Sequence, residues 1–233
     1  HQGEAGWVAR VRQALAEDRF TLFAQPAAPL SPDHPQAYVE ILVRLVAEDG
    51  AIVLPGAFMP AAERSQQIEH IDRWVATHIF QLMSDGLLLS NEVVALNMSA
   101  SSLSSPGFIE FLRQEITSRA LPVEQICFEI TETAAAFDFQ RACEAMLLLR
   151  RLGCRFALDD FGSGLASYRY LKQLPVDYVK IDGELIKDLS CDPINEVIIE
   201  SMQRIARVMN IRTIAESVES EEVKAQLVRI GVD

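Results

Sequence analysis

The chain has 233 residues, 49% of them hydrophobic, and is therefore long enough to bury a continuous core. Its formal net charge of -12 argues against binding of a DNA or RNA polymer, because each phosphate contact would require a lysine or an arginine. The four cysteines and four histidines lack metal-ligand spacing, which gives no support to a Cys/His zinc site and favours a reducing, cytoplasmic compartment. No linker, repeat or membrane-spanning apolar run divides the sequence, so we treat residues 1–233 as a single domain.

Hydrophobic periodicity predicts helices and short apolar strands that alternate along the chain. The expected strands are, in order, Phe20–Ala24, Ala37–Arg44, Val93–Leu96, Gln125–Ile130, Arg155–Leu158, Asp177–Ile181 and Ile211–Ala215. The expected helices are Trp7–Leu15, Phe58–Glu63, Ile68–Met83, Ser101–Ser118, Phe139–Leu152, Tyr168–Leu174, Pro193–Met209 and Ser220–Ile230. This alternation is typical of a parallel α/β architecture, and the number of units favours a (β/α) barrel over an open doubly wound sheet.

Polar side chains, most of them acidic, stand within or just after the predicted strands. They are Glu40, Asn97, Glu129, Asp159, Asp160, Lys180 and Glu216. In a barrel the carboxyl ends of parallel strands converge on one face, so we expect these side chains to meet in one cleft. Their mutual repulsion requires cations, and oxygen ligands without histidine or cysteine favour Mg²⁺ or Mn²⁺.

Each of these residues also has an ordinary structural interpretation. A single acidic residue after a strand is often a helix N-cap or a solvated loop residue, and Thr131 followed by Glu132 fits an N-cap with its first-turn acid. The adjacent pair Asp159 and Asp160 could instead bridge two metal ions. Lys180 has apolar neighbours in its strand, so it is either half of a structural salt bridge or a group acting beside a metal-bound water.

Short motifs occur in a fixed order along the chain. They are Gln25-Pro26, Glu40-Ile41-Leu42-x-Arg44, Leu96–Ser99, Phe128–Glu132, Leu158–Gly164, Val179–Asp182 and Ala215–Glu219. In this order they resemble the motifs of the EAL-domain cyclic di-GMP phosphodiesterases over nearly the whole chain. The resemblance implies a TIM-like barrel whose first strand runs antiparallel to the others.

The resemblance further implies hydrolysis of cyclic di-GMP to linear pGpG by a water activated by two divalent ions, Mg²⁺ or Mn²⁺. The alternative is a receptor that binds the dinucleotide without cutting it. Such domains typically lose the first glutamate or one of the paired aspartates, whereas Glu40, Asp159 and Asp160 are all present here.

A role for each matching residue also follows from the resemblance. The expected metal ligands are Glu40, Asn97, Glu129, Asp159, Asp160 and Glu216. The expected catalytic residues are Lys180, Glu216 and Glu40, with Lys180 orienting or activating the attacking water. The expected contacts to the dinucleotide are Gln25, Leu42, Arg44 and Asp182. The residues expected to support the loop from Asp160 to Gly164 are Thr131, Glu132, Ser163 and Glu219.

Two positions within the motifs depart from the family pattern. Ile41 replaces an alanine on the side of the strand facing away from the site, and Ser217 replaces a glycine beside Glu216, where a shift of the backbone is expected. The family usually continues with a Gln-Gly-Tyr/Phe segment after Asp233, so we expect a fragment of a longer multidomain protein that is truncated before the final strand. We also expect tethering to regulatory domains, a membrane anchor in the parent protein, and a homodimer formed through helices near the Asp159–Gly164 loop.

Overall fold

The centre of the molecule is an eight-stranded sheet, seen in a computed structural model that describes residues 2–32, 34–88, 92–162 and 168–233. The strands are β1 (Phe20–Ala27), β2 (Tyr38–Val46), β3 (Ile52–Val53), β4 (Val93–Asn97), β5 (Ile126–Thr131), β6 (Arg155–Phe161), β7 (Tyr178–Ile181) and β8 (Arg212–Ala215). Strands β2, β4, β5, β6, β7 and β8 pair in parallel in that order, while β1 pairs antiparallel with β2. Both the parallel α/β architecture and the antiparallel first strand are thus confirmed.

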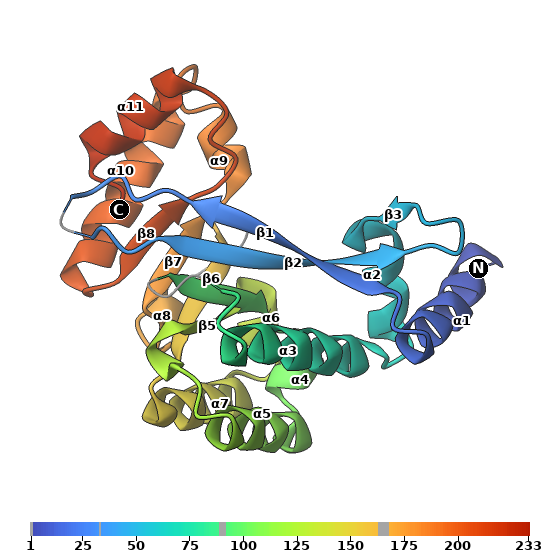
Figure 1. Ribbon diagram of the computed structural model, residues 1–233. Helices are drawn as coiled ribbons and strands as arrows, with labels where there is room; N and C mark the ends of the chain where they lie inside the picture. The colour runs from blue at the N-terminus through green and yellow to red at the C-terminus, as the bar shows by residue number, and fades with distance from the viewer. Residues whose placement is uncertain (1, 33, 89–91, 163–167) are drawn as a thin grey trace.

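Helices follow most strands and cover the outer face of the curled sheet (Figure 1). They are α1 (Gln2–Ala16), α2 (Pro55–Arg64), α3 (Ile68–Ser84), α4 (Ala100–Leu103), α5 (Pro106–Ser118), α6 (Glu132–Phe137), α7 (Phe139–Leu152), α8 (Tyr168–Leu171), α9 (Gly183–Lys187), α10 (Pro193–Val208) and α11 (Glu221–Ile230). Helices α9, α10 and α11 gather beside β8, whereas α1 and α2 pack together at the far end of the long β1–β2 hairpin. None of the described helices combines the length and apolar character needed to cross a bilayer.

Successive side chains of each strand point to opposite faces of the sheet, so the buried residues form two separate cores, one on each face. Outward-facing residues such as Phe128 and Phe156, whose ring centroids are 5.5 Å apart, pack beneath the helices and are fully buried. Inward-facing residues form a smaller cluster inside the curl of the sheet, made of Tyr38, Val93, Ala95, Cys127, Ala157 and Tyr178. The small inner cluster lies just below the carboxyl ends of the strands, and it forms the base of the site described next.

The predicted helix over residues 101–118 is two helices in the structure. Ser105 caps α5 by accepting a hydrogen bond from the backbone N–H of Phe108, and Pro106 stands at the first helical position, where it has no N–H to donate. The serine side chain and the proline together favour a new helix start at this point. The short helix α9 was absent from the sequence-based prediction, and α6 was indicated only by the N-cap interpretation of Thr131 and Glu132.

The sheet is curled but not closed within the described residues, because β1 and β8 are its two edge strands. The backbone carbonyl of Asp233 accepts hydrogen bonds from the N–H groups of Leu30 and Ser31, at 2.7 and 3.1 Å. The segment after β1 is thereby fixed near the end of α11. The strand ends consequently surround a hollow that opens between β1 and β8.

Candidate functional site

Lys180 marks the centre of the predicted carboxylate cluster. Its Nζ atom lies 3.0 Å from Glu40, 2.8 Å from Glu129, 3.1 Å from Asp159 and 2.8 Å from Glu216. The five residues come from β2, β5, β6, β7 and the residue after β8, so strands far apart in the sequence meet at one point. The convergence expected from parallel strands is therefore present.

Strand register explains why these particular residues face one another. Gln25 of β1 stands opposite Glu40 of β2, and Asn97 of β4 stands opposite Glu129 of β5. The Nδ2 atom of Asn97 donates to Glu40 Oε1 at 3.0 Å. Asn97 is thus held beside two of the carboxylates that it was predicted to accompany as a metal ligand.

Asp160 reaches the site because of an irregularity in β6. In a regular strand two consecutive side chains point to opposite faces, yet the pairing of β6 with β7 shifts register between Leu158 and Phe161. Asp160 has a positive φ of 55°, a conformation that aspartate tolerates better than most residues. The bulge turns Asp160 back beside Asp159, and its backbone N–H donates to Asp159 Oδ1 at 3.0 Å.

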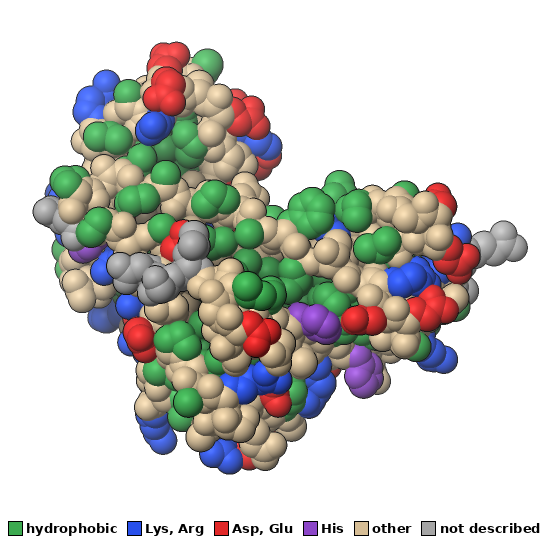
Figure 2. Space-filling view, viewed as in Figure 1, with side chains coloured by type: hydrophobic (Ala, Val, Ile, Leu, Met, Phe, Trp, Pro, Cys, Tyr) green, Lys and Arg blue, Asp and Glu red, His purple; other side chains and the backbone are tan. Residues whose placement is uncertain are grey.

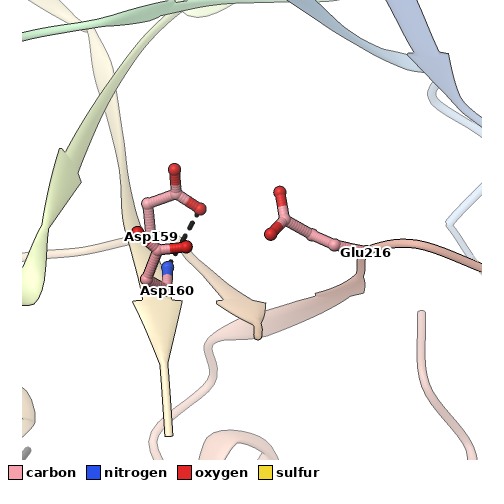
Figure 3. A group of neighbouring side chains, drawn as sticks. All are labelled: Asp159, Asp160 and Glu216. Carbon is pink, nitrogen blue, oxygen red and sulfur yellow. Dashed lines mark hydrogen bonds between the residues drawn. The ribbon is translucent and has the colours of Figure 1, made fainter. Parts of the chain in front are cut away.

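Asp159, Asp160 and Glu216 form a group that suits a divalent cation. One carboxylate oxygen from each lies within 4.8 Å of the others, and Figure 3 shows the side chains of Asp159 and Glu216 pointing toward one another. The donors are all oxygens, which fits Mg²⁺ or Mn²⁺. With Glu40, Glu129 and Asn97 close by, the donor set is large enough for more than one ion.

The electrostatics of the site favour added positive charge. Burial raises the pKa of Glu129 to about 8, with Lys180 opposing that rise and Glu40 adding to it. Burial also raises the pKa values of Asp160 and Glu216. Burial alone would lower the pKa of Lys180, but the surrounding carboxylates raise it well above its ordinary value, so the ammonium stays charged. One ammonium among several carboxylates leaves an excess of negative charge that cations would stabilise.

Tyr38 belongs to this site although the sequence analysis did not select it. Its hydroxyl donates to Glu129 Oε1 at 2.6 Å. The signal that could have found it is its position two residues before Glu40 in one strand, which places both side chains on the same face. An aromatic hydroxyl on that face is a natural partner for a buried carboxylate.

The four residues predicted to contact a dinucleotide lie on β1, on β2 and directly after β7, and Gln25 is the one among them that lines the cavity. Gln25, exposed on β1, stands opposite Glu40, and Leu42 stands opposite the exposed Phe23. The guanidinium of Arg44 lies over the Phe23 ring, 5.4 Å from its centroid. Asp182 accepts a hydrogen bond from the backbone N–H of Glu184 at 2.8 Å and caps α9.

The residues predicted to support the loop after β6 differ in location: Thr131 and Glu132 stand at the start of α6, whereas Glu219 follows β8. The Thr131 side chain accepts from the N–H of Ala134 and caps α6, and Glu132 lies in the first turn, as the N-cap interpretation predicts. Glu219 is exposed, and Ser163 lies outside the described residues. Ser217 has a positive φ of 53°, the conformation that a glycine at this place would adopt without strain.

A cavity of about 500 Å³ lies between β1 and β8 and includes Glu40, Lys180 and Glu216 in its wall. The space-filling view shows the molecular surface notched between the lobe with α11 and the lobe with β3, and apolar side chains gather along the β1–β2 hairpin on the floor of the notch (Figure 2). The carboxylates are therefore accessible to a ligand that enters from the surface.

Known proteins resemble this chain in sequence and in fold. Residues 8–233 match the family described as EAL domain. The chain is 39% identical over 97% of its length to cyclic di-GMP phosphodiesterase PdeB of Shewanella oneidensis, and 32% identical over 96% to cyclic di-GMP phosphodiesterase PdeF of Escherichia coli. It spans only 27% and 30% of the length of those two proteins.

Solved structures give the same result for the fold. The FimX EAL domain of Pseudomonas aeruginosa, described as bound to c-di-GMP, superposes with a TM-score of 0.90 at 30% identity and covers 97% of this chain and 91% of its own. The PaMucR phosphodiesterase in a c-di-GMP complex superposes with a TM-score of 0.88 at 29% identity, over 98% of this chain and 93% of its own. With the strand order, the carboxylate site and the match over residues 8–233 in agreement, the chain belongs to the EAL domain family.

Proposed function

We propose that the chain hydrolyses cyclic di-GMP to linear pGpG with the help of two divalent ions, Mg²⁺ or Mn²⁺. The observation that carries the proposal is the convergence of Glu40, Glu129, Asp159 and Glu216 on Lys180, with Asp160 and Asn97 beside them. The names of the relatives from S. oneidensis and E. coli support the substrate.

The donor set assigns the residues that would hold the ions. Asp159, Asp160 and Glu216 form one group, and Glu40, Asn97 and Glu129 surround the neighbouring position, with Asp159 shared between the two. When bound, the two ions would lower the pKa of water and neutralise charge on the scissile phosphodiester.

Lys180 acts in this scheme as a hydrogen-bond donor that orients the attacking water. Its ammonium stays protonated because the carboxylates around it raise its pKa, and a protonated lysine has donors but no acceptor. It therefore orients the water without accepting its proton.

Arg44 extends a planar fork of donors that suits a phosphate oxygen, while Gln25, Leu42 and Asp182 contact the rest of the dinucleotide. Attack in line then forms the bond from the water oxygen to phosphorus and breaks the bond from phosphorus to the 3′ oxygen, which takes up a proton from solvent as the water releases its own.

Substitution of Glu40 by glutamine tests the hydrolysis. Glu40→Gln keeps the size of the side chain but removes a charged ligand, and we expect product formation from cyclic di-GMP and Mn²⁺ to fall at least about 100-fold, in line with the loss of a preorganised electrostatic group. Chromatography of the products, with and without a chelator, measures the effect. Glu48→Gln is the matched control, because Glu48 is exposed two residues beyond the end of β2.

A receptor is the second candidate, since one similar solved chain is described only as bound to c-di-GMP. Cyclic di-GMP that binds the chain but is recovered intact at saturating Mn²⁺ would contradict the hydrolase and support the receptor. Because the chain spans less than a third of its two named relatives, we also propose that it works as one domain of a longer protein.

A further inference from the structure

Tyr38 occupies a protected position beneath the carboxylate cluster. It is the first residue of β2, its side chain points inward on the same face as Glu40, and the residue is only 6% exposed. Its hydroxyl donates to Glu129 Oε1 at 2.6 Å, which is within the usual range for a hydrogen bond from a hydroxyl to a carboxylate. The side chain therefore contacts a proposed metal ligand from the wall of the cavity, with little of its own surface exposed.

The ring of Tyr38 is fixed by its neighbours. It packs edge-on against Tyr178, with ring centroids 5.2 Å apart and an interplanar angle of 63°. Small side chains on the adjacent strands, Ala95, Cys127 and Ala157, belong to the same buried cluster and leave room for the two rings. A rigid ring gives its hydroxyl a fixed location, so the hydrogen bond to Glu129 has a defined direction.

The two oxygens of Glu129 are held by two different donors. Oε1 accepts from Tyr38 and Oε2 accepts from Lys180 at 2.8 Å. Lys180 alone does not define the orientation of Glu129, because the same ammonium also contacts Glu40, Asp159 and Glu216. Within the described residues the Tyr38 hydroxyl bonds no other carboxylate, and its second contact is the weak acceptor Cys127 Sγ at 3.6 Å. The tyrosine therefore restrains the orientation of the Glu129 carboxylate together with Lys180.

We propose that Tyr38 is a positioning residue whose hydroxyl orients Glu129 for divalent-metal binding. The inference deepens the proposed function and rests on its assignment of Glu129 as a ligand. A carboxylate ligand holds its metal best when a hydrogen bond from outside the coordination sphere fixes its rotamer, and loss of such a bond lowers metal affinity by about 10- to 100-fold. Tyr38 itself does not need to touch the metal or the dinucleotide.

The test compares two isosteric deletions in the same cluster. Tyr38→Phe removes the hydroxyl that bonds Glu129 and keeps the ring. Tyr178→Phe is the matched control, because the Tyr178 hydroxyl accepts from Arg155 Nη1 at 2.8 Å and is not among the donors to Glu129 within the described residues. Mn²⁺ alone, without dinucleotide, is titrated into each folded variant and followed by calorimetry and electron paramagnetic resonance.

We expect the Kd for Mn²⁺ to rise about 10- to 100-fold in Tyr38→Phe and less than about 3-fold in Tyr178→Phe. Turnover by Tyr38→Phe should recover as Mn²⁺ is raised to saturation, because the ligand itself is still present. A Kd for Mn²⁺ in Tyr38→Phe within 3-fold of the Kd of the parent chain overturns the proposal. An equal rise in the Kd in both variants overturns it as well.

The same experiment separates this proposal from the proposed function. A parent chain that binds Mn²⁺ but leaves cyclic di-GMP intact contradicts hydrolysis, while a weakened Mn²⁺ site in Tyr38→Phe would still support the role of Tyr38. A parent chain that binds no Mn²⁺ overturns both. Circular dichroism of the three proteins confirms that the comparison is made between folded chains.

Discussion

Asp72, on the buried face of α3, holds the loop that follows Asn97. Its Oδ2 atom accepts a hydrogen bond from the backbone N–H of Ser99 at 3.1 Å, and the residue is only 6% exposed. Burial raises the pKa of Asp72 to about 6, although hydrogen bonds from Ser102 and Ser99 act in the opposite direction. A carboxylate on an outer helix thereby anchors the strand end that carries a proposed metal ligand.

The raised pKa of Asp72 predicts a pH-dependent stability. Because the folded state holds this proton more tightly than the unfolded chain, whose value is 3.8, the contribution of Asp72 to the free energy of unfolding declines between about pH 4 and pH 6 and is fully lost above that. The difference of roughly two pKa units between the folded and unfolded states corresponds to about 3 kcal/mol of unfolding free energy. Asp72→Asn lacks this titration, so its stability relative to the parent chain should improve by up to that amount from pH 4 to pH 7.

Urea unfolding of both proteins across this pH range measures the difference. Parallel curves of unfolding free energy against pH for the parent chain and Asp72→Asn would contradict the prediction. The comparison removes the contribution of other titrating groups, because they are common to both proteins.

The residues of the site were predictable from the sequence to different degrees. Glu40, Asn97, Glu129 and Lys180 stand within or at the end of strands, so alternation and parallel pairing were enough to place them together. Tyr38 was missed because tyrosine at an inward position of a strand is ordinarily a core residue. Its position two residues before Glu40 indicates the shared face, and the contact with Glu129 distinguishes it from an ordinary core tyrosine.

At the scale of single elements, the main difference from the sequence-based prediction is the end of β6. The prediction ended this strand at Leu158, whereas the structure continues it through a bulge to Phe161. Hydrophobic alternation cannot show a bulge, because the positive φ of Asp160 depends on the pairing with β7. The same limit applies to α9, whose five residues are too few for a periodic pattern.

The end of α7 offers a test of local backbone strain. Gly153 caps this helix with a φ of 110°, and a Cβ atom placed there would lie 2.6 Å from Val123 Cγ2. Gly153→Ala should therefore lower the free energy of unfolding by roughly 2 to 4 kcal/mol, from backbone strain together with overpacking.

Gly50 is the matched control for this change. It also has a positive φ, of 84°, but an added Cβ would meet nothing within 4 Å. Gly50→Ala should cost only about 1 kcal/mol, which is the backbone contribution alone. Urea unfolding measures the free energy of unfolding of both variants. Equal decreases in the two would show that the contact with Val123 does not add to the cost.

At the scale of the whole molecule, the carboxylate cluster couples metal binding to stability. The cluster joins β2, β5, β6, β7 and the end of β8, so an ion bound there binds the folded chain and not the unfolded one. At a concentration about 100 times its Kd, a ligand of this kind contributes about 2.7 kcal/mol. For a chain of this size the melting temperature should rise by roughly 5 to 10 °C.

Differential scanning calorimetry with Mn²⁺ or Mg²⁺ measures this shift. A potassium salt at the same ionic strength is the control, since it screens the same charges without matching the site. Glu216→Gln should reduce the shift, because Glu216 belongs to the group of three carboxylates. A shift of equal size with potassium would mean that screening alone stabilises the chain.

The overall architecture was predictable because it repeats one simple unit. Apolar strands and amphipathic helices alternate, and this pattern alone indicates a parallel α/β fold. The antiparallel direction of β1 was available only from the family resemblance, because a strand has the same alternation of side chains in either direction. The open edges at β1 and β8 likewise depend on tertiary pairing.

Strand order along the sheet also bears on how the chain reaches its native state. Except for β3, each strand pairs with the next one in the sequence, so the sheet can grow by addition of neighbouring units with short loop closures. The carboxylates, in contrast, come from residues as far apart as Glu40 and Glu216. A nascent chain can therefore build most of this sheet early, yet it becomes competent to bind a metal at the carboxylate cluster only when β8 has docked.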